Sequence, residues 1–322
     1  MNFQKAYDLI KQAQEIAIIG HIRPDGDCIG SALAINSHIE ILGKATTVFS
    51  NSDIPVQLSY LEGYGKIQTK FPENEKFDLL IVLDLNQSDR MGVFEPLLKC
   101  AKKVLCLDHH IGTPDFKTDV TIANSDYASC GEIIYEFFTS QKIKITKQMA
   151  NALYTSISTD TGCFLYPATT AHTHLVAAEL IKLGCDIELI NYMNFRVFDK
   201  QFIMGLKQIF RNLRFKHDGQ ISYSMLKRAS IYDDSQQTKF KQSVSDIKGV
   251  RASIIAAQER RNVFHISLRS HGNVNVEIPA RHFGGGGHKN AAGFTIRGKY
   301  KKIIKQIITE VEKLLISNER NN

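Results

Sequence analysis

Histidines and aspartates occur together in four short segments of this sequence, and these side chains bind hard divalent cations. The segments hold His21, Asp25 and Asp27; Asp84; Asp108-His109-His110; and Asp160. Imidazoles and carboxylates without a thiolate suit Mn²⁺, Mg²⁺ or a similar ion. Two such ions side by side activate water and stabilise an in-line displacement at phosphorus. The residue types therefore predict a two-metal phosphoesterase.

Three of these segments follow directly after short apolar runs. The runs are Ile16–Ile19, Leu79–Leu83 and Val104–Leu107, and each indicates a buried strand. The carboxyl ends of parallel strands face one crevice, where open α/β sheets bind their ligands. We therefore expect the histidines and aspartates to meet at that edge of a sheet.

Each group also has a less specific explanation. A lone acid at a strand end is more often a solvated loop residue, and an Asp-His-His triplet occurs by chance. Cys28 and Cys163 flank two of the segments, but nothing pairs them at ligand spacing, so core packing explains them better. His172 and His174 are expected on different faces of a helix and cannot share an ion, so no function is assigned to them.

The first half of the chain alternates strand and helix patterns, which favours an α/β domain with a mainly parallel sheet. Strands are expected near residues 15–20, 46–50, 77–84 and 102–107, and helices over 30–42, 130–139, 146–159 and 169–183. Residues 187–212 have a helical pattern of mixed charge, which predicts a connector. Further strands are expected over 221–226, 253–258, 263–268 and 293–296, before an amphipathic helix over 301–316.

Composition is that of an ordinary soluble protein, with 43% hydrophobic and 23% charged residues in a chain of 322. The net charge of +7 is unevenly divided. Residues 1–194 hold 16 Lys and Arg against 23 Asp and Glu, whereas residues 195–322 hold 24 against 10. The acidic half would bind metal and the basic half phosphate. Solubility alone also explains lysines such as Lys299, Lys301, Lys302 and Lys305.

Targeting signals are absent from the sequence. No apolar stretch is long enough to span a bilayer, and Met1–Gln14 lacks the apolar centre of a signal peptide. The six cysteines show no Cys-x-x-Cys pairing. Reduced thiols in a cytoplasmic protein are expected from that usage.

The ordered motifs resemble those of the DHH phosphoesterases. They are the histidine and two aspartates of residues 21–27, Asp84 at a strand end, Asp108-His109-His110, and Ser158-Thr159-Asp160-Thr161-Gly162. Gly284–Gly287 followed by His288 resembles the signature of the DHHA1 domain that accompanies many of these enzymes. The motifs extend from about residue 18 to residue 294, so the resemblance covers nearly the whole chain.

The resemblance implies a role for each residue of the metal site. His21 and Asp25 would hold one ion, Asp27, His109 and Asp160 the other, and Asp84 would bridge them. Asp108 would orient an imidazole, His110 would face the substrate as an acid or hydrogen-bond donor, and Arg90 would pair with a site acid or touch phosphate. The expected cofactor is a pair of divalent ions, Mn²⁺ first, with Mg²⁺ or Co²⁺ as alternatives.

The resemblance also implies the domain order. A DHH catalytic domain is expected at residues 1–186, a linker at 187–212 and a smaller α/β DHHA1 domain at 213–322, with a cleft between the domains. The N–H groups of a glycine run can face an anion, although a lone run is more often a hinge. The residues expected to bind substrate are Arg269, Ser270, Gly285, Gly286, Gly287 and His288. Among them Arg269 is the best candidate for a bidentate grip on phosphate.

Within the family the chain is most similar to the short bacterial oligoribonucleases that also act on 3′-phosphoadenosine 5′-phosphate (pAp). The implied activity converts short RNA to 5′-mononucleotides and removes the 3′-phosphate of pAp to give AMP. Linear di-adenylate (pApA) or a cyclic dinucleotide is an alternative substrate, and pyrophosphate or polyphosphate a less favoured one. A binding protein with a dead site would need a missing ligand, and none is missing. Short RNA and pAp are therefore the expected partners, no membrane is expected, and a homodimer stays open.

Overall fold

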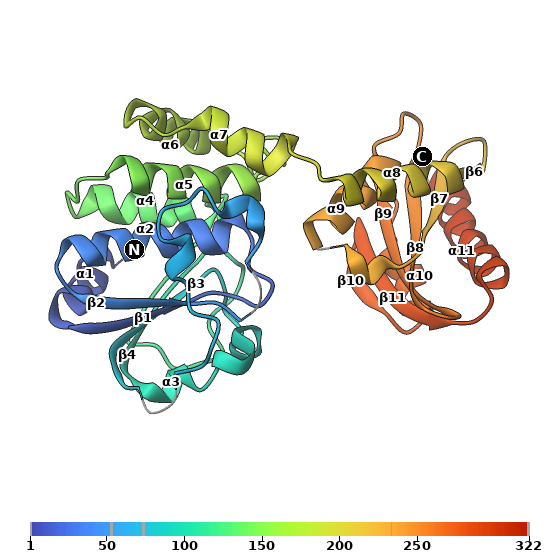
Figure 1. Ribbon diagram of the computed structural model, residues 1–322. Coiled ribbons are helices and arrows are strands. Elements are labelled where there is room, and N and C mark those ends of the chain that lie inside the picture. The colour runs from blue at the N-terminus through green and yellow to red at the C-terminus, as the bar shows by residue number, and fades with distance from the viewer. Residues whose placement is uncertain (1, 52–53, 73–74, 233, 321–322) are drawn as a thin grey trace. The chain divides into compact units, whose positions relative to one another are not determined.

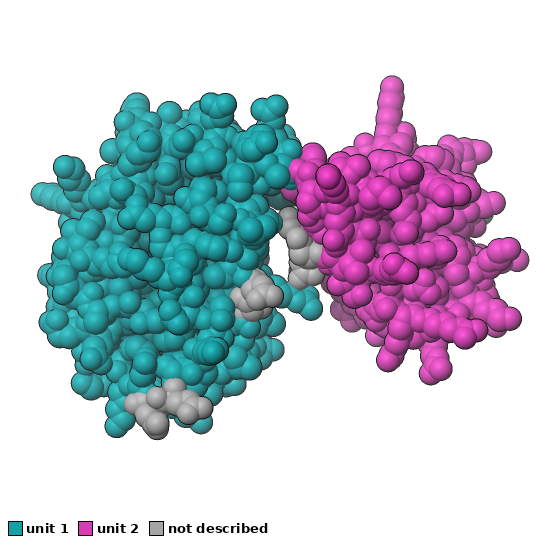
Figure 2. Space-filling view, in the orientation of Figure 1, with its two compact units in different colours: residues 1–197 teal, residues 198–322 magenta. Residues whose placement is uncertain are grey.

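The computed structural model describes residues 2–51, 54–72, 75–232 and 234–320. By its internal contacts the chain divides into two compact units, unit 1 at residues 1–197 and unit 2 at residues 198–322 (Figure 2). Each unit has its own hydrophobic clusters. The two units are therefore described separately.

The division between the units falls inside the segment 187–212, for which the sequence indicates a helical connector. This segment contains α7 (Ile187–Asn191), a π-helix (Tyr192–Arg196) and α8 (Lys200–Asn212). Helix α8 packs on the sheet of unit 2 through Phe202 and Ile209, so it belongs to that unit.

Unit 1 is built on a five-stranded parallel sheet in the order β2-β1-β3-β4-β5. Its strands are β1 (Glu15–Ile19), β2 (Ala45–Phe49), β3 (Phe77–Leu83), β4 (Ala101–Asp108) and β5 (Val120–Ala123). The central strands are nearly all apolar because a parallel sheet is buried on both faces. The register sets Ile19 beside Val82, and Leu83 beside Leu107, so β1, β3 and β4 end at one edge. The α/β fold with a parallel sheet is confirmed.

Helices of unit 1 lie in layers over this sheet. They are α1 (Phe3–Gln12), α2 (Gly26–Ile41), α3 (Leu97–Cys100), α4 (Cys130–Ser140), α5 (Lys147–Asp160) and α6 (Ala171–Lys182). Short 3₁₀ helices lie at Val56–Leu58, Tyr64–Lys66 and Ser88–Phe94. Helices α2, α4 and α5 cover one face, with α6 and α7 outside them (Figure 1).

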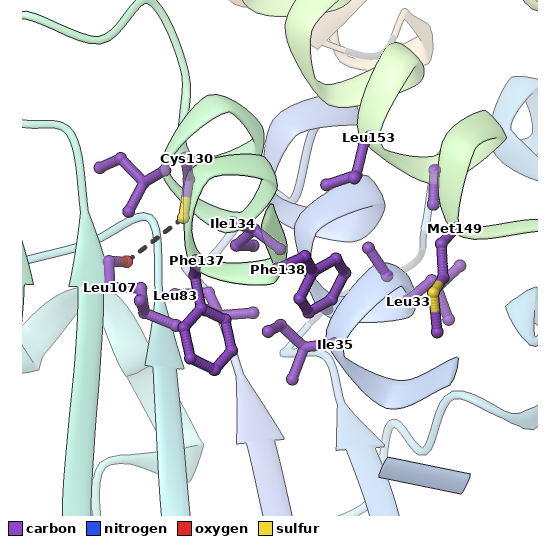
Figure 3. Close-up of a cluster of buried hydrophobic side chains, with 14 of the residues drawn as sticks. Leu33, Ile35, Leu83, Leu107, Cys130, Ile134, Phe137, Phe138, Met149 and Leu153 are labelled. Carbon is purple, nitrogen blue, oxygen red and sulfur yellow. Dashed lines mark hydrogen bonds between the residues drawn. The ribbon is translucent and has the colours of Figure 1, made fainter. Parts of the chain in front are cut away.

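The main core of unit 1 lies between the sheet and the layer of α2, α4 and α5. Phe137 and Phe138 of α4 are fully buried there, against side chains from α2 and from the strands (Figure 3). Burying a side chain of this size contributes about 1.5–3 kcal/mol. The thiol of Cys130 donates a hydrogen bond of 3.3 Å to the carbonyl of Leu107, which joins the start of α4 to the end of β4.

Helix α2 begins earlier than the sequence pattern predicts, at Gly26 rather than at residue 30. Asp25 is its N-cap, and the Asp25 carboxylate accepts the backbone N–H groups of Asp27 and Cys28, each at 3.0 Å. Such a cap satisfies backbone donors that have no partner inside the helix. Because the cap directly follows β1, Asp25 and Asp27 are held at the edge where the strands end.

Unit 2 has a six-stranded mixed sheet in the order β10-β11-β9-β8-β7-β6. Its strands are β6 (Arg214–Lys216), β7 (Ile221–Leu226), β8 (Ala252–Arg260), β9 (Val263–Ser270), β10 (Gly286–His288) and β11 (Ala291–Arg297). Strands β7 and β8 are parallel, and the other described pairs are antiparallel.

The two faces of this sheet are covered differently. Helix α11 (Tyr300–Arg320) packs on one face with Phe264, Ile266 and Leu268. Helices α8 and α9 (Asp234–Ser245) pack on the other face, over β7 and β8, through Phe240 and Ile255. Figure 1 shows α8 and α11 on opposite sides of the strands.

Four elements of unit 2 are absent from the sequence prediction, namely β6, α9, α10 (Glu277–His282) and β10. Helix α9 is strongly polar, so its apolar periodicity is weak. The glycine run predicted as a loop contains β10, and α10 precedes it. None of the described helices combines the length and the apolar character needed to cross a membrane.

Candidate metal centre

Asp84 lies at the middle of the histidine and aspartate cluster in unit 1. It follows β3 directly, is 3% exposed and has a positive φ of 59°. Its Oδ2 atom lies 3.2 Å from His21 Nε2, and its Oδ1 atom lies 3.3 Å from His109 Nε2. The two oxygens of one carboxylate thus face two different imidazoles. An aspartate tolerates the left-handed conformation better than most residues, and such conformations gather at functional sites.

Three groups of ligand atoms could each hold an ion, because within each group the atoms lie within 4.8 Å of one another. The groups are His21 with Asp25 and Asp84; Asp27 with His109 and Asp160; and Asp84 with His109 and His110. The first two correspond to the ligand sets that the family resemblance implies, and Asp84 of the first lies 3.3 Å from His109 of the second. The third also brings His110 within reach of an ion.

His21 is fixed by a hydrogen bond between its Nδ1 atom and the carbonyl of Ile22, at 2.7 Å. Only a protonated Nδ1 can donate this bond, so Nε2 is the free nitrogen that faces Asp84. The backbone of Ile22 is held in turn, because its N–H donates to the carbonyl of Arg90 at 2.7 Å. The imidazole is therefore oriented before any ion binds.

Asp27 is buried beneath the site and accepts four hydrogen bonds. Its Oδ1 atom accepts Ser31 Oγ at 3.0 Å and Ser156 Oγ at 2.5 Å. The N–H groups of Cys130 and Gly131, in the first turn of α4, donate to the same carboxylate at 2.8 and 3.2 Å. The start of a helix favours an anion.

These four bonds leave one edge of the Asp27 carboxylate directed at the site, with Oδ2 3.6 Å from His109 Nε2. Sequence reasoning missed the two serines, although a signal existed. Ser31 is one helical turn after Asp27, and Ser156 is one turn before Asp160.

Asp108 is paired with His110. The carboxylate is fully buried, and its Oδ1 atom lies 2.7 Å from His110 Nδ1 and accepts the His110 backbone N–H at 3.2 Å. The imidazole that Asp108 orients is thus that of His110, whose side chain is 40% exposed. With Nδ1 engaged, Nε2 is the nitrogen left to meet a substrate.

Burial and crowding shift the acid–base behaviour of the site. Burial raises the pKa of Asp27 to about 7 and that of Asp160 to about 8, and neighbouring carboxylates add to both shifts. Burial lowers the pKa of His21 and of His109, but hydrogen bonds and attraction to Asp84 and other acids outweigh it and hold both pKa values at about 10. For Asp84 the imidazole contacts outweigh burial, and its pKa lies below the usual range.

One structural observation at Asp84 indicates that these side chains suit divalent ions. Asp84 Oδ1 is buried without a hydrogen-bond partner among the described residues, although His109 Nε2 is 3.3 Å away. A buried carboxylate oxygen without a partner is costly. Ions beside Asp84 would satisfy this oxygen, and their charge would replace the protons that the site otherwise retains.

Gly26 is the first residue of α2 and has no positive φ, so it does not form a left-handed turn between Asp25 and Asp27. A Cβ atom there would lie 2.3 Å from Thr159 Oγ1, next to Asp160. Glycine is therefore needed for the close approach of α2 to α5.

Arg90 lies in the 3₁₀ helix after β3, where its carbonyl binds Ile22. Within the described parts of the chain its guanidinium makes no ion pair, so the structure shows no pairing with a site acid, and the contact with phosphate stays a prediction. Cys28 and Cys163 carry free thiols, and Cys28 is buried. His172 lies 3.2 Å from Glu136, and the ring of His174 stacks on Phe164.

In unit 2 the strand register aligns most of the residues expected to bind substrate. His288 is opposite Ala291, and Ala291 is opposite Arg269, so Arg269 and His288 project from the same face. Burial lowers the pKa of the Arg269 guanidinium, which donates to the carbonyl of Leu268 at 2.9 Å. An anion bound there would compensate for this partial burial.

Ser270 does not join this row. It projects to the opposite face, is buried, and donates its hydroxyl to the carbonyl of Val274 at 2.7 Å. The glycines differ among themselves. A Cβ at Gly285 would lie 2.2 Å from the carbonyl oxygen of Gly293, and one at Gly287, with φ of 144°, 2.5 Å from that of Ala291. Gly286 has open space instead, so of these three glycines it is the one whose position leaves room for a ligand.

Comparison with known proteins agrees with both units. The DHH family N-terminal domain matches residues 15–157, and the DHHA1 domain matches residues 222–315. The chain belongs to the DHH family, in its form with a DHHA1 domain.

Its relatives include proteins described as bifunctional oligoribonuclease and PAP phosphatase NrnA. The one from Mycoplasma genitalium is 30% identical over 331 residues, covering 98% of each chain. The one from Thermus thermophilus is 29% identical and covers 92% of this chain and 90% of its own. Among solved structures, an exopolyphosphatase-related protein from Bacteroides fragilis superposes with a TM-score of 0.86 at 24% identity, over 97% of this chain and 95% of its own.

Proposed function

We propose that this protein is a two-metal phosphoesterase that hydrolyses short oligoribonucleotides to 5′-mononucleotides and removes the 3′-phosphate of pAp. The observation that carries the proposal is Asp84, whose two buried oxygens face His21 and His109 separately. The relatives named as oligoribonucleases and PAP phosphatases over nearly their whole length support the substrate class.

The site residues divide between two ions, for which we propose Mn²⁺ first and Mg²⁺ or Co²⁺ as alternatives. His21 and Asp25 would hold one, Asp27, His109 and Asp160 the other, and Asp84 both. When bound, such ions activate water and neutralise charge at phosphorus. The four carboxylates and two neutral imidazoles roughly balance two divalent charges, so an anionic substrate is not repelled.

His110 is the proposed acid for the leaving group. Its Nδ1 atom is held by Asp108, so Nε2 would donate a proton or a hydrogen bond to the departing O3′ atom. Short RNA and pAp both contain a P–O3′ bond. Water adds its oxygen to phosphorus, O3′ leaves with the proton, and the product is either a 5′-mononucleotide or inorganic phosphate. One site therefore serves both reactions.

Arg269 and His288 are the proposed anion contacts of unit 2, with the backbone of Gly286 and Gly287 beside them. Arg90, whose guanidinium is free of ion pairs within the described chain, is proposed to touch phosphate. Ser270 is proposed only as a support for the strand, because its hydroxyl is committed to Val274.

A homodimer is a further proposal, through the outer layer of unit 1. Apolar side chains are exposed on α6 and α7, namely Leu175, Ile181, Leu183, Ile187 and Leu189. Contiguous exposed apolar residues often mark an interface between subunits. Light scattering should give twice the monomer mass for the wild type and a monomer for Leu175→Glu with Leu189→Glu. A monomeric wild type would remove this proposal.

A substrate panel tests the catalytic proposal. Protein loaded with Mn²⁺ should hydrolyse RNA of two to five residues and pAp, and both activities should be lost in EDTA. Linear di-adenylate, a cyclic dinucleotide and pyrophosphate complete the panel. Faster turnover of pyrophosphate than of RNA or pAp would overturn the proposal.

The six free cysteines fit a reducing compartment, and we propose the cytoplasm.

A further inference from the structure

Part of the unit 2 sheet has one uncovered face. Side chains alternate between the two faces of a strand, and one set on β9 and β11 packs on α11. On the opposite face, within the described residues, α8 and α9 pack over β7 and β8, and α9 also reaches part of β9. What remains is a strip along β9 and β11, here called the open strip, formed by Arg260, His265, Ser267, Arg269, Gly293, Thr295 and Arg297. Apart from Ser267, these residues are half-buried or exposed.

Each end of the open strip carries cationic side chains. At one end Arg269 is aligned with His288 through Ala291. At the other end Arg260 and Arg297 are both opposite Val263, one on each neighbouring strand. Residues directly opposite each other project to the same face. The two arginines are therefore on the face that carries Arg269.

A β-bulge places Arg260 on this face. Gln258 is opposite Phe264, and the register shifts before Arg260 pairs with Val263. Without the shift, Arg260 would lie on the face of Gln258, which is the face covered by α11. The extra residue, Glu259, turns the arginine to the open face.

The charges at this second end are not neutralised by the part of the chain that the structure describes. Neither Arg260 nor Arg297 makes an ion pair with any residue that the structure describes. The middle of the strip is small and polar, with the ring of His265 beside Gly293. A Cβ at Gly293 would lie 3.3 Å from His265 Nε2, so glycine makes room for the ring. A nucleotide base can stack on an aromatic ring such as imidazole, and a glycine beside the ring leaves room for the base.

The length of the strip limits what it could bind. Arg269 and Val263 are six residues apart on β9, which is about 20 Å at roughly 3.3 Å per residue. A nucleic-acid strand rises about 3.4 Å per nucleotide when its bases are stacked. About six nucleotides would therefore span the strip, or fewer if the strand is stretched.

We propose that the open strip binds single-stranded RNA beyond the phosphate held at Arg269, and that Arg260 and Arg297 form the distal phosphate contact. This inference rests on the proposed function, because it extends the substrate site of the same enzyme. It predicts that RNA affinity rises with length up to about six residues and then levels off. A dinucleotide and pAp do not reach the distal arginines.

The test compares two double variants that lose the same charge. Arg260→Gln with Arg297→Gln removes both charges of the distal contact and leaves a shorter polar side chain at each position. Lys301→Gln with Lys302→Gln is the matched control, because these exposed lysines lie at the same end of the sheet, at the start of α11 on its other face. The ratio of kcat/KM for a hexanucleotide to that for a dinucleotide should fall about tenfold in the arginine variant and stay at the wild-type value in the control.

Binding without turnover gives a second measurement. Fluorescence anisotropy of a labelled hexanucleotide in EDTA should show that the arginine variant has lost about 1.4 from the slope of log Kd against log salt, since each phosphate contact on a single strand contributes roughly 0.7. An unchanged slope, or equal losses in both double variants, would overturn the proposal. Displacement of the RNA by polyglutamate at equal charge concentration would also overturn it, in favour of a general polyanion surface.

Failure of the proposed function is a separate result. If the wild type cleaves neither RNA nor pAp, the catalytic proposal is lost, whereas the anisotropy measurement still decides whether RNA occupies the strip.

Discussion

The metal centre of unit 1 and the open strip of unit 2 hold their charges in opposite ways. His21, Asp27 and Asp84 are buried, and each lies against one or more polar groups of the protein. The arginines at the far end of the strip are exposed and have no carboxylate partner among the described residues. Losing one member of a buried polar cluster leaves the others without a partner, which costs several times more than losing an exposed charge. Substitutions in unit 1 should therefore affect every substrate, and those in unit 2 only selected substrates.

Asp84→Asn gives the largest expected effect. The amide keeps the shape of the carboxylate but cannot hold two cations, so hydrolysis of both short RNA and pAp should be abolished. Metal content by mass spectrometry should fall well below that of the wild type. Asp126→Asn, an exposed acid in a loop of the same unit, is the control. If Asp84→Asn retained more than a small fraction of activity on either substrate, Asp84 would not bridge the ions.

His110→Ala should keep its metal and slow turnover by roughly 10²–10⁴-fold, the range for a lost proton-transfer group. Asp108→Asn should show part of the same defect, because the imidazole loses the carboxylate that orients it. Metal analysis of the purified variant separates the two roles that the geometry allows. Loss of an ion from His110→Ala would make His110 a ligand, as its place beside Asp84 and His109 also permits.

Arg269→Ala should lower kcat/KM for short RNA by about 10–150-fold, the value of one charge-assisted hydrogen bond of roughly 1.5–3 kcal/mol. Metal content should be unchanged. Bis(p-nitrophenyl) phosphate has no distal group, so its slow hydrolysis should change little. Arg281→Ala is the control, because Arg281 is exposed and pairs with Glu277. An equal loss on both substrates would place Arg269 at the scissile phosphate or in folding.

The smallest expected effect concerns the metal-free protein, whose free energy of unfolding should change with pH. The folded protein keeps protons on Asp27 and Asp160 up to about pH 7–8 and on His21 and His109 up to about pH 10, whereas the unfolded chain releases them near their ordinary pKa values. Between pH 7 and 8.5 the folded state binds more protons, so its stability falls as the pH rises.

Each extra proton that the folded state retains contributes about 1.4 kcal/mol per pH unit to this fall, and each kcal/mol is roughly 2–4 °C in Tm. Calorimetry in EDTA measures it, and protein loaded with Mg²⁺ should show a much weaker dependence. A Tm that rises with pH in EDTA would contradict the shifts assigned to the site.

The sequence was sufficient to predict those parts of the site in which the residue types and their spacing have a single chemical explanation. The histidines and aspartates at the strand ends come together because parallel strands end at one edge, as their apolar runs predict. Ser31 and Ser156 were missed because serine has many uses, and only the fold shows that both reach Asp27. Ser270 was misplaced because a motif does not say to which face of a strand each residue points.

Conformation at single positions was also beyond the sequence. Asp25 is both a helix cap and a candidate ligand. Because it caps α2, the helix begins at Gly26, whereas the sequence pattern predicts a start at residue 30. The bulge that turns Arg260 has no sequence signature in the residues Gln258 to Arg260. Such features depend on partners that are distant in the chain.

The close approach at Gly26 has a consequence for the size of the cation. Asp25 and Asp27 are at the start of α2, Asp160 is at the end of α5, and the two helices meet where Gly26 faces Thr159. The radius of the ion that fits depends on how far apart its oxygen ligands are held. A methyl group at position 26 would push the helices apart and enlarge the site, which would favour an ion larger than the proposed Mn²⁺, such as Ca²⁺. A single hydrogen in place of a side chain thus keeps the ligand oxygens of the two helices close together.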